Sequence, residues 1–399
     1  MNVYELKARV RRRVDELMPE LGALSDDIFA HPELRFQERH AVEAIARLLR
    51  AHGIDVEVGA AGLPTAFVAA LPGHRSGSRV GILAEYDALP EIGHACGHNL
   101  IGTSAVGAFL ALAAVADELQ GSVVLYGTPA EEGGAGKVVM LEHDTFDGLD
   151  VAMMTHPFHL ATAVDTPFLA SGMLTLQFHG RPSHAAAAPT EGINALDALV
   201  MTYVGVNGLR QRVPKDINIA GIITHGGAAA NVIPDFAELV YVVRAEKWQR
   251  AQQVMEQVAR VAEGAAAAVG ATVDVVNRKS DLAQFPFYTE EKQNAALQRI
   301  FRDNLDVAGI SHQPYTPDMG QGSTDFANLS QEIPGMHLML RLDGTDRPPH
   351  TAEFARAAGS EHGRKWLREA ASVMAMSAVD VLNDEGALEE VRSAFREAR

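Results

Sequence analysis

The sequence is short of cysteine, aromatic residues and positive charge. Its 399 residues contain one cysteine, Cys96, and 6% aromatic residues. A single cysteine cannot form a disulfide within the chain, which fits a reducing compartment, so we expect a cytoplasmic protein. The 34 basic residues are outnumbered by 51 acidic ones, giving a net charge of -17. Because nucleic acids and anionic membranes repel such a chain, we expect neither as a partner.

Long uninterrupted apolar runs are also scarce. The N-terminal segment is charged and lacks the apolar stretch of a signal peptide. The run LIGTSAVGAFLALAAVA at 100–116 is uncharged, but it contains Thr103 and Ser104 and follows a polar motif. It indicates a buried core helix rather than a membrane span. The composition, 47% apolar and 21% charged, is that of a globular protein, and the length favours two domains.

Apolar strands alternate with helices up to about residue 170. We expect strands at 65–73, 79–89, 122–132 and 151–157, with helices at 26–53 and after Asn99. The alternation predicts an α/β fold with a largely parallel sheet sandwiched by helices. A helix from about residue 285, a strand at 336–342 and a long helix at 356–382 resume this pattern. We therefore expect residues 1–170 and 285–399 to form one domain.

Residues 171–284 follow a different order. The expected elements are strand, helix, strand, strand, helix and strand, at 172–180, 192–211, 217–227, 237–246, 247–270 and 272–280. This β-α-β-β-α-β order is typical of a ferredoxin-like α+β domain. Because α/β features resume after it, we expect this domain to be an insertion.

Acidic and imidazole side chains follow the apolar strands of the first domain. They are Asp87, Glu131, Glu132, His156 and His350. Ligands of open α/β sheets bind at the carboxyl ends of the strands. Cys96 and His98, in the motif GHACGHN, begin the helix beside them. We expect these side chains to converge on one site.

Cys96 has three possible roles at such a site. A buried inert thiol would be ordinary. A catalytic nucleophile could use His94 or His98 as its base, but this leaves the other polar residues unexplained. A metal ligand would combine thiolate with imidazole and carboxylate, a set that suits zinc or another first-row divalent ion. The set would be Cys96, His98, Glu132, His156 and His350, and five ligands favour two ions over one.

Together the motifs resemble the aminoacylase and carboxypeptidase-like dinuclear metallopeptidases of clan MH. The matching segments, in order along essentially the whole chain, are AEYDALPEIGHACGHNLIG, GTPAEEGGAGK, THP, GRPSHAAAAPTEGINALDA, NVIPDFAELVYVVRA, GSTDFANLS and PHTAEF. The branch is that of the amidohydrolases, including hippurate hydrolase, auxin-conjugate hydrolases and aminobenzoyl-glutamate hydrolase. The chain looks most similar to the β-alanyl-lysine dipeptidase-like members, which share Asn99 where many others have Asp.

The resemblance implies a role for each candidate residue. It implies two divalent ions per subunit (zinc or manganese, with cobalt possible), bound by Cys96, His98, Glu132, His156 and His350. It also implies Glu131 as the catalytic base, with Asp87 supporting the metal site. The insertion resembles a lid and dimerisation domain in which His184 reaches a neighbouring active site, while Asn231 and Arg244 hold substrate. Ser323 and Thr324 stand where other members often have an acidic residue, and we expect them near the substrate.

The expected activity is hydrolysis of an amide bond in a small N-acyl amino acid or dipeptide by a homodimer, with water activated by metal and Glu131 as general base. One alternative is a metal-bearing subunit of a heteromeric aminobenzoyl-glutamate-type hydrolase, or a binding protein, inactive alone. A second is a cysteine-dependent amidase. His31 and His94 have no assigned role.

Overall fold

The computed structural model describes residues 2–71, 77–276 and 287–398. The chain forms two compact units: the first unit is Met1–Pro167 with Glu291–Arg399, and the second is Phe168–Glu290. Each unit has a hydrophobic core of its own. The boundary expected at 284 and 285, and the part of the expected strand 272–280 beyond Val276, lie outside the described residues.

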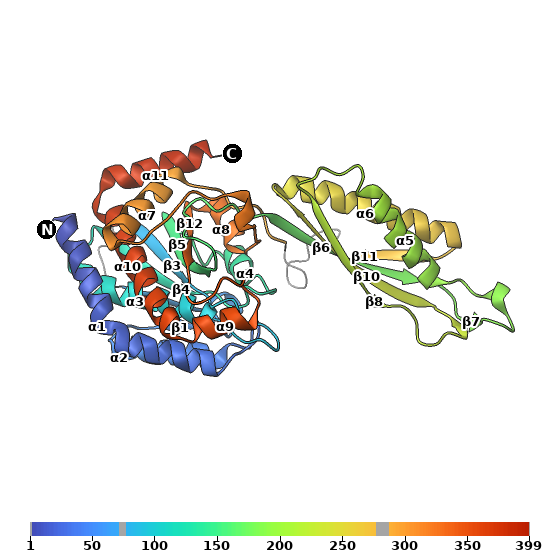
Figure 1. The fold of residues 1–399 in the computed structure, drawn as a ribbon, viewed down its shortest axis with the longest axis horizontal. Helices are drawn as coiled ribbons and strands as arrows, with labels where there is room; N and C mark the ends of the chain where they lie inside the picture. The colour runs from blue at the N-terminus through green and yellow to red at the C-terminus, as the bar shows by residue number, and fades with distance from the viewer. Residues whose placement is uncertain (1, 72–76, 277–286, 399) are drawn as a thin grey trace. The chain divides into compact units, whose positions relative to one another are not determined.

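The first unit is built on a mixed sheet (Figure 1). Its strands, in spatial order, are β1 (Glu57–Val58), β2 (Phe67–Ala70), β4 (Gly121–Gly127), β3 (Ser78–Ala84), β5 (Val151–Phe158) and β12 (Gly335–Arg341). Strands β4, β3, β5 and β12 are parallel, whereas β2 runs antiparallel to β4 and β1 antiparallel to β2. The carboxyl ends of the parallel strands therefore meet at one edge.

Helices cover this sheet on both faces, as expected. On one side α3 (His98–Ala113) and α10 (Glu361–Asn383) contact the strands, and α1 (Val3–Ala30) packs on both helices. On the other side, α4 (Gly136–Glu142) packs with α8 (Phe326–Glu332), as Figure 1 shows. The remaining helices of this unit are α2 (Arg39–Ala51), α7 (Ala295–Ala308), α9 (Ala352–Ala358) and α11 (Glu385–Glu397).

Helix α3 is the core of the first unit. Every side chain from His98 to Leu112 is buried, because the sheet covers one side of the helix while α1 and α10 cover the other. A helix that is apolar on all sides needs such complete cover. The expected core helix is thus confirmed. Within the described ranges, no helix combines the length and apolarity needed to cross a membrane.

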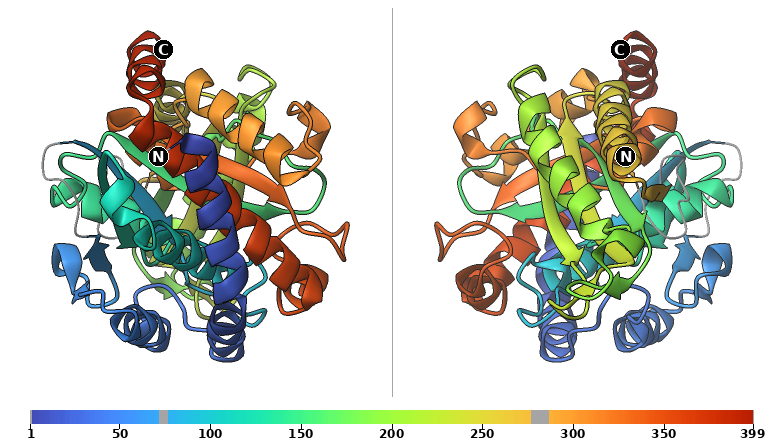
Figure 2. Two further views of the ribbon diagram at one scale, coloured as in Figure 1. Left: turned by 90° about the vertical axis from the view of Figure 1, so that its left-hand side faces the viewer. Right: turned by 90° about the vertical axis from the view of Figure 1, so that its right-hand side faces the viewer.

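The second unit has the ferredoxin-like order that the sequence predicts. Its antiparallel sheet runs β11 (Thr272–Val276), β6 (Ala170–His179), β10 (Phe236–Ala245) and β8 (Asn218–His225). Helices α5 (Ala195–Leu209) and α6 (Trp248–Val269) lie over the same face of this sheet (Figure 2, right). The sequence did not predict the small ribbon of β7 (Ser183–His184) and β9 (Val232–Ile233).

One expected helix, 26–53, is in fact two. Helix α1 ends at Ala30, and α2 begins at Arg39. Pro32 has no amide hydrogen with which to continue α1. The carboxylate of Glu33 accepts hydrogen bonds from the backbone N–H groups of His40 and Ala41, at 3.0 and 3.1 Å, and so caps the start of α2.

The expected helix at 356–382 is divided in the same way. Helix α9 ends at Ala358, and α10 begins at Glu361. The Ser360 side chain accepts a hydrogen bond from the N–H of His362 and caps α10. Such capping satisfies backbone donors that have no partner within the helix, so it can start a new helix inside a continuous apolar pattern.

Candidate active site

Three groups of candidate metal ligands lie at the carboxyl edge of the first sheet, and a fourth, Glu85 with Glu131 and Asp325, adjoins them through Glu131. Within each group the ligand atoms lie within 4.8 Å of one another. The three groups are Cys96 with His98 and His156, Cys96 with Glu132 and His350, and His98 with Glu131 and Glu132. Because they share members, they form one cluster, which we call the edge cluster. It brings together the five expected ligands and the expected base.

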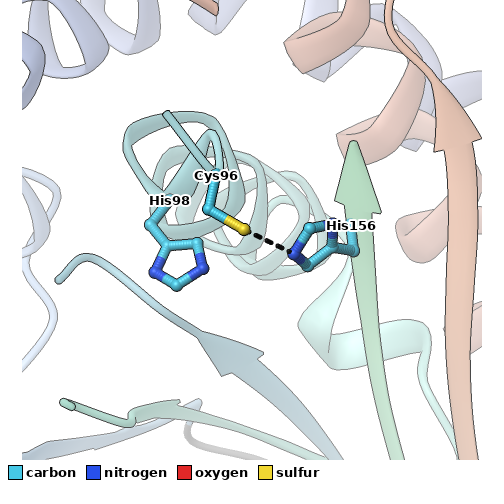
Figure 3. Close-up of side chains that lie close together, drawn as sticks. All are labelled: Cys96, His98 and His156. Carbon is cyan, nitrogen blue, oxygen red and sulfur yellow. Dashed lines mark hydrogen bonds between the residues drawn. The ribbon is translucent and has the colours of Figure 1, made fainter. Parts of the chain in front are cut away.

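The GHACGHN motif places Cys96 and His98 at the start of α3 (Figure 3). Cys96 Sγ lies 3.4 Å from Nε2 of His156. Gly97, which separates Cys96 from His98 in the sequence, has φ 76°. A Cβ at this position would lie 2.6 Å from Cγ of Pro157. Glycine therefore allows α3 to approach β5 closely. His156 lies within β5, inside the strand that the sequence predicts at 151–157. Its Nδ1 donates to the Pro157 carbonyl at 2.8 Å.

Asp87 orients two members of the edge cluster. Its Oδ1 lies 2.8 Å from Nδ1 of His98, and its Oδ2 accepts from the backbone N–H of Glu132 at 2.9 Å. Burial alone would raise the pKa of Asp87, but the imidazole of His98, the N–H of Glu132 and the Lys137 ammonium together hold that pKa below its usual value. With Nδ1 occupied by a carboxylate, His98 directs Nε2 toward Glu85 and Glu132. Carboxylates commonly orient metal-binding imidazoles in this way.

Three polar atoms of this region are buried without a hydrogen-bond partner among the described residues. They are His98 Nε2, Glu132 Oε1 and Glu85 Oε2. His98 Nε2 lies 3.8 Å from Glu132 Oε1 and 3.6 Å from Glu85 Oε2. Buried polar atoms are nearly always satisfied, because desolvation without compensation is costly. Imidazole, carboxylate and thiol groups around such atoms fit a first-row divalent ion.

Glu131 and Glu132 stand in a loop with an unusual backbone. Ala130 before them has φ 62°, and its N–H donates to buried Glu38 at 2.9 Å. His350, opposite, has φ 68°, and its N–H donates to the Ala95 carbonyl at 2.9 Å. Non-glycine residues in this conformation are strained, and the strain is maintained only where surrounding contacts require it.

The pKa of Glu131 rises well above its usual value. Burial is the main cause, followed by the neighbouring carboxylates of Glu85 and Glu132. A carboxylate with a raised pKa binds a proton more readily near neutral pH.

The surroundings of Cys96 argue against a nucleophile. Burial raises the pKa of the Cys96 thiol well above its usual value, and the carboxylate of Glu132 adds to this rise. Nucleophilic cysteines instead need an electropositive setting that lowers their pKa. A metal ion could displace the proton from such a thiol, since ligands bind in their deprotonated form.

A buried ion-pair network lies directly behind the edge cluster. Lys137 Nζ is 2.5 Å from Glu85 Oε1 and 2.5 Å from Asp325 Oδ1, and all three side chains are inaccessible to water. None of these three residues was predicted from the sequence. A signal was available, because Glu85 follows β3 just as Asp87 does, and Asp325 lies in the GSTDF motif.

Two other predicted residues lie beside Asp325. Thr324 is 2% exposed, and its hydroxyl accepts from the Phe326 N–H at 3.2 Å, at the start of α8. The Ser323 hydroxyl has no hydrogen-bond partner among the described residues. Their contact with substrate stays a prediction.

His94, which had no assigned role, is a core residue. Its Nε2 donates to the Ile28 carbonyl at 3.1 Å, and burial lowers its pKa to about 4. A neutral imidazole bonded to the main chain is an ordinary way to bury histidine.

The remaining predicted residues belong to the second unit. His184 is exposed on β7, and its Nδ1 accepts from the backbone N–H groups of Ala186 and Ala187 at 3.2 and 3.1 Å. The proton of a neutral ring therefore resides on Nε2. The main chain at Ala185 bonds to the Asn231 carbonyl, so Asn231 lies beside this ribbon. Arg244 is exposed on β10 and has no ion-pair partner among the described residues.

Comparison with known proteins places these features in a family. The profile of Peptidase family M20/M25/M40 matches residues 81–373. The Xaa-Arg dipeptidase of Mus musculus is 37% identical over 410 residues, covering 98% of this chain and 92% of the relative. A subunit of the p-aminobenzoyl-glutamate hydrolase of Escherichia coli K12 is 28% identical, covering 94% of this chain and 91% of the relative. A dinuclear metal-binding M20 peptidase from Bacillus subtilis shares the fold, with a TM-score of 0.67 at 24% identity over 92% of this chain and 99% of that one.

Proposed function

Because the chain belongs to peptidase family M20/M25/M40 and hydrolyses amide bonds in small acyl amino acids or dipeptides, we propose that the edge cluster is its active site. In this proposal Cys96, His98, Glu132, His156 and His350 hold two divalent ions. The observation that carries it is the pair of buried atoms His98 Nε2 and Glu132 Oε1, which have no hydrogen-bond partner among the described residues, with His350 Nε2 3.4 Å from the same glutamate oxygen. The thiol favours zinc over manganese or cobalt, because thiolate is a soft ligand. Divalent ions would lower the pKa of an attacking water and polarise the amide carbonyl.

Glu131 acts as the base in this proposal. Its raised pKa suits a group that takes a proton from water and later releases it to the leaving amine. Asp87 keeps His98 in the required orientation and tautomer. The single charge of the Lys137 ammonium partly offsets those of Glu85 and Asp325, which limits the negative charge behind the edge cluster.

His184 acts on the substrate carbonyl in this proposal. Its Nδ1 is committed to the backbone, so the Nε2–H remains available to donate to the oxyanion that develops during attack. We propose that a second copy of the chain supplies this group.

The homodimer is supported by the exposed surface of the second unit. Strand β8 is an edge of its sheet, and Ile222 and Ile223 on it are exposed. Val200 and Val204 on α5 are also exposed. Apolar side chains next to an open strand edge are a natural interface for self-pairing. A monomeric, fully active wild type in sedimentation velocity would contradict the dimer.

For the substrate we propose a dipeptide with a basic C-terminal residue. Similarity to Xaa-Arg dipeptidase over almost the whole chain supports this class, and a net charge of -17 attracts cationic substrates. The planar guanidinium of Arg244 suits the substrate carboxylate. N-acyl amino acids remain the second class, because the hydrolase subunit from Escherichia coli is also similar.

One experiment tests the active-site proposal. The purified chain, loaded with zinc or manganese, is assayed on Xaa-Arg, Xaa-Lys and β-alanyl dipeptides, N-acyl amino acids and p-aminobenzoyl-glutamate. Glu131→Gln should keep its metal content and lose turnover about 100- to 10,000-fold. Near-normal turnover of this variant would refute the role of Glu131. A metal-loaded wild type inactive on every substrate would instead support a subunit that needs a partner.

A further inference from the structure

A second cluster of metal-binding side chains lies where α1 meets α2, outside the edge cluster. Asp27 is in the last turn of α1, His31 caps the end of that helix, and His40 is in the first turn of α2. One ligand atom from each lies within 4.8 Å of the other two. We infer that this α1–α2 cluster binds a further divalent ion of the zinc type, independently of the proposed function.

The geometry of His40 points to a ligand. Its Nε2 lies 3.1 Å from Asp27 Oδ1, but their orientation is not that of a hydrogen bond. This nitrogen is buried and has no hydrogen-bond partner among the described residues. The same Asp27 Oδ1 lies 3.2 Å from Nδ1 of His31, so one carboxylate oxygen faces both imidazoles, and the lone pair of the buried His40 Nε2 remains available to a cation.

His31 is arranged to present its other nitrogen. Its Nδ1 is 2.8 Å from the Asp27 carbonyl oxygen, so this nitrogen carries the proton and Nε2 keeps a lone pair. The ring centroids of His31 and His40 are 4.2 Å apart at an interplanar angle of 36°. Ligands of tetrahedral zinc are about 3.3 Å apart for bond lengths of about 2.0 Å. The His31 side chain is 55% exposed, so its ring has room to turn Nε2 toward a bound ion.

The backbone holds the α1–α2 cluster in place. The Glu33 carboxylate caps α2 at His40 and Ala41, which fixes where the His40 ring emerges. Two imidazoles and one carboxylate satisfy three positions of a tetrahedral ion and leave one for water, so the site is open.

Binding here would act on the wall of the edge cluster. The segment 31–38 between the two helices contacts the loops that carry the catalytic candidates. The Glu33 carbonyl accepts from the Ala88 N–H at 2.8 Å, and Arg35 donates to the Gly133 carbonyl at 2.7 Å. A cation that joins the ends of this segment would therefore restrain the neighbours of Asp87 and Glu132.

The test compares zinc content in matched variants. The full chain is stripped with chelator, dialysed against a fixed concentration of zinc and analysed for metal per chain. Wild type should hold about one equivalent more than the His31→Gln/His40→Gln double variant, whatever the edge cluster binds. His52→Gln is the control, because this histidine pairs with Glu20 at 2.9 Å and lies outside the α1–α2 cluster. Asp27→Asn should weaken the extra site about tenfold or more while keeping both imidazoles.

A second readout needs no activity. Hydrogen exchange of residues 31–38 should slow on addition of zinc in wild type and His52→Gln, and not in the double variant. Circular dichroism confirms that each variant is folded. Equal zinc content in wild type and the double variant, or equal slowing of exchange in both, would overturn the inference.

Discussion

The predicted site residues of the two units are held in opposite ways. In the first unit most of them are buried or half-buried and contact one another, as His98 does with Asp87, although the His350 side chain is exposed. In the second unit His184 and Arg244 are exposed, and only the backbone or solvent surrounds their functional groups. In the first unit the folded chain already holds the side chains in position. In the second unit the side chains gain a function only when a substrate or a second copy of the chain contacts them. Removing one side chain from a buried network therefore destabilises its partners, whereas removing an exposed side chain leaves its neighbours unaffected.

The largest expected effect comes from a substitution in the buried ion-pair network. Lys137→Met leaves Glu85 and Asp325 buried without their cation, so we expect a loss of about 3–5 kcal/mol in the free energy of unfolding. Urea denaturation measures it. The control is Lys365→Met, which removes an exposed lysine 2.8 Å from Asp343 and should cost about 1 kcal/mol or less. Equal losses in both variants would show that burial does not distinguish the two pairs.

The second test concerns the exposed imidazole. His184→Ala removes one proposed oxyanion donor, so kcat should fall about 100- to 1000-fold with no loss of metal. Mixing this variant with Glu131→Gln should then restore about a quarter of wild-type activity, because half of randomly exchanged dimers are mixed and each has one complete site. Mixed subunits that exchange but recover no activity would place His184 in the site of its own chain, or outside any site.

The sequence predicted different parts of the molecule for different physical reasons. Hydrophobic period and strand-helix order predicted both units, including the ferredoxin-like order of β6 to β11, because these depend on which faces are buried. The polar residues at the carboxyl ends of the strands predicted where the side chains of the edge cluster meet. The break at Pro32 and the separate start of α10 at Ser360 were missed, because a few capping hydrogen bonds decide them. The partners of Lys137 were missed, since only the folded chain shows that Glu85 and Asp325 face it.

The third test is substrate recognition in the second unit. Arg244→Lys keeps the charge but loses the planar fork, so KM for a dipeptide with a free carboxylate should rise about tenfold while kcat changes little. The matched control is the same dipeptide amidated at its C-terminus, for which both enzymes should show the same KM. An equal rise for both substrates would assign Arg244 to folding or assembly rather than to the carboxylate.

The smallest expected effect contrasts two glutamates. Burial raises the pKa of Glu38 to about 7, whereas hydrogen bonds from Gln177 and Thr224 lower the pKa of half-buried Glu238. Folded Glu38 therefore binds a proton more tightly than the unfolded chain does, so stability is lost as pH rises from the unfolded value of 4.5 through about 7, and the loss levels off above that. Between pH 6 and 8, the free energy of unfolding of the wild type should fall by about 1.4 kcal/mol relative to Glu38→Gln.

Glu238→Gln provides the opposite sign. A lowered pKa contributes stability that is present above the unfolded value of 4.5 and is lost only as pH falls below it. The difference between wild type and Glu238→Gln should therefore stay constant from pH 6 to 8, when urea denaturation is measured on chelated protein. A constant difference for Glu38→Gln as well would mean that Glu38 is ionised in the folded chain, and that the Ala130 N–H and nearby groups compensate its burial.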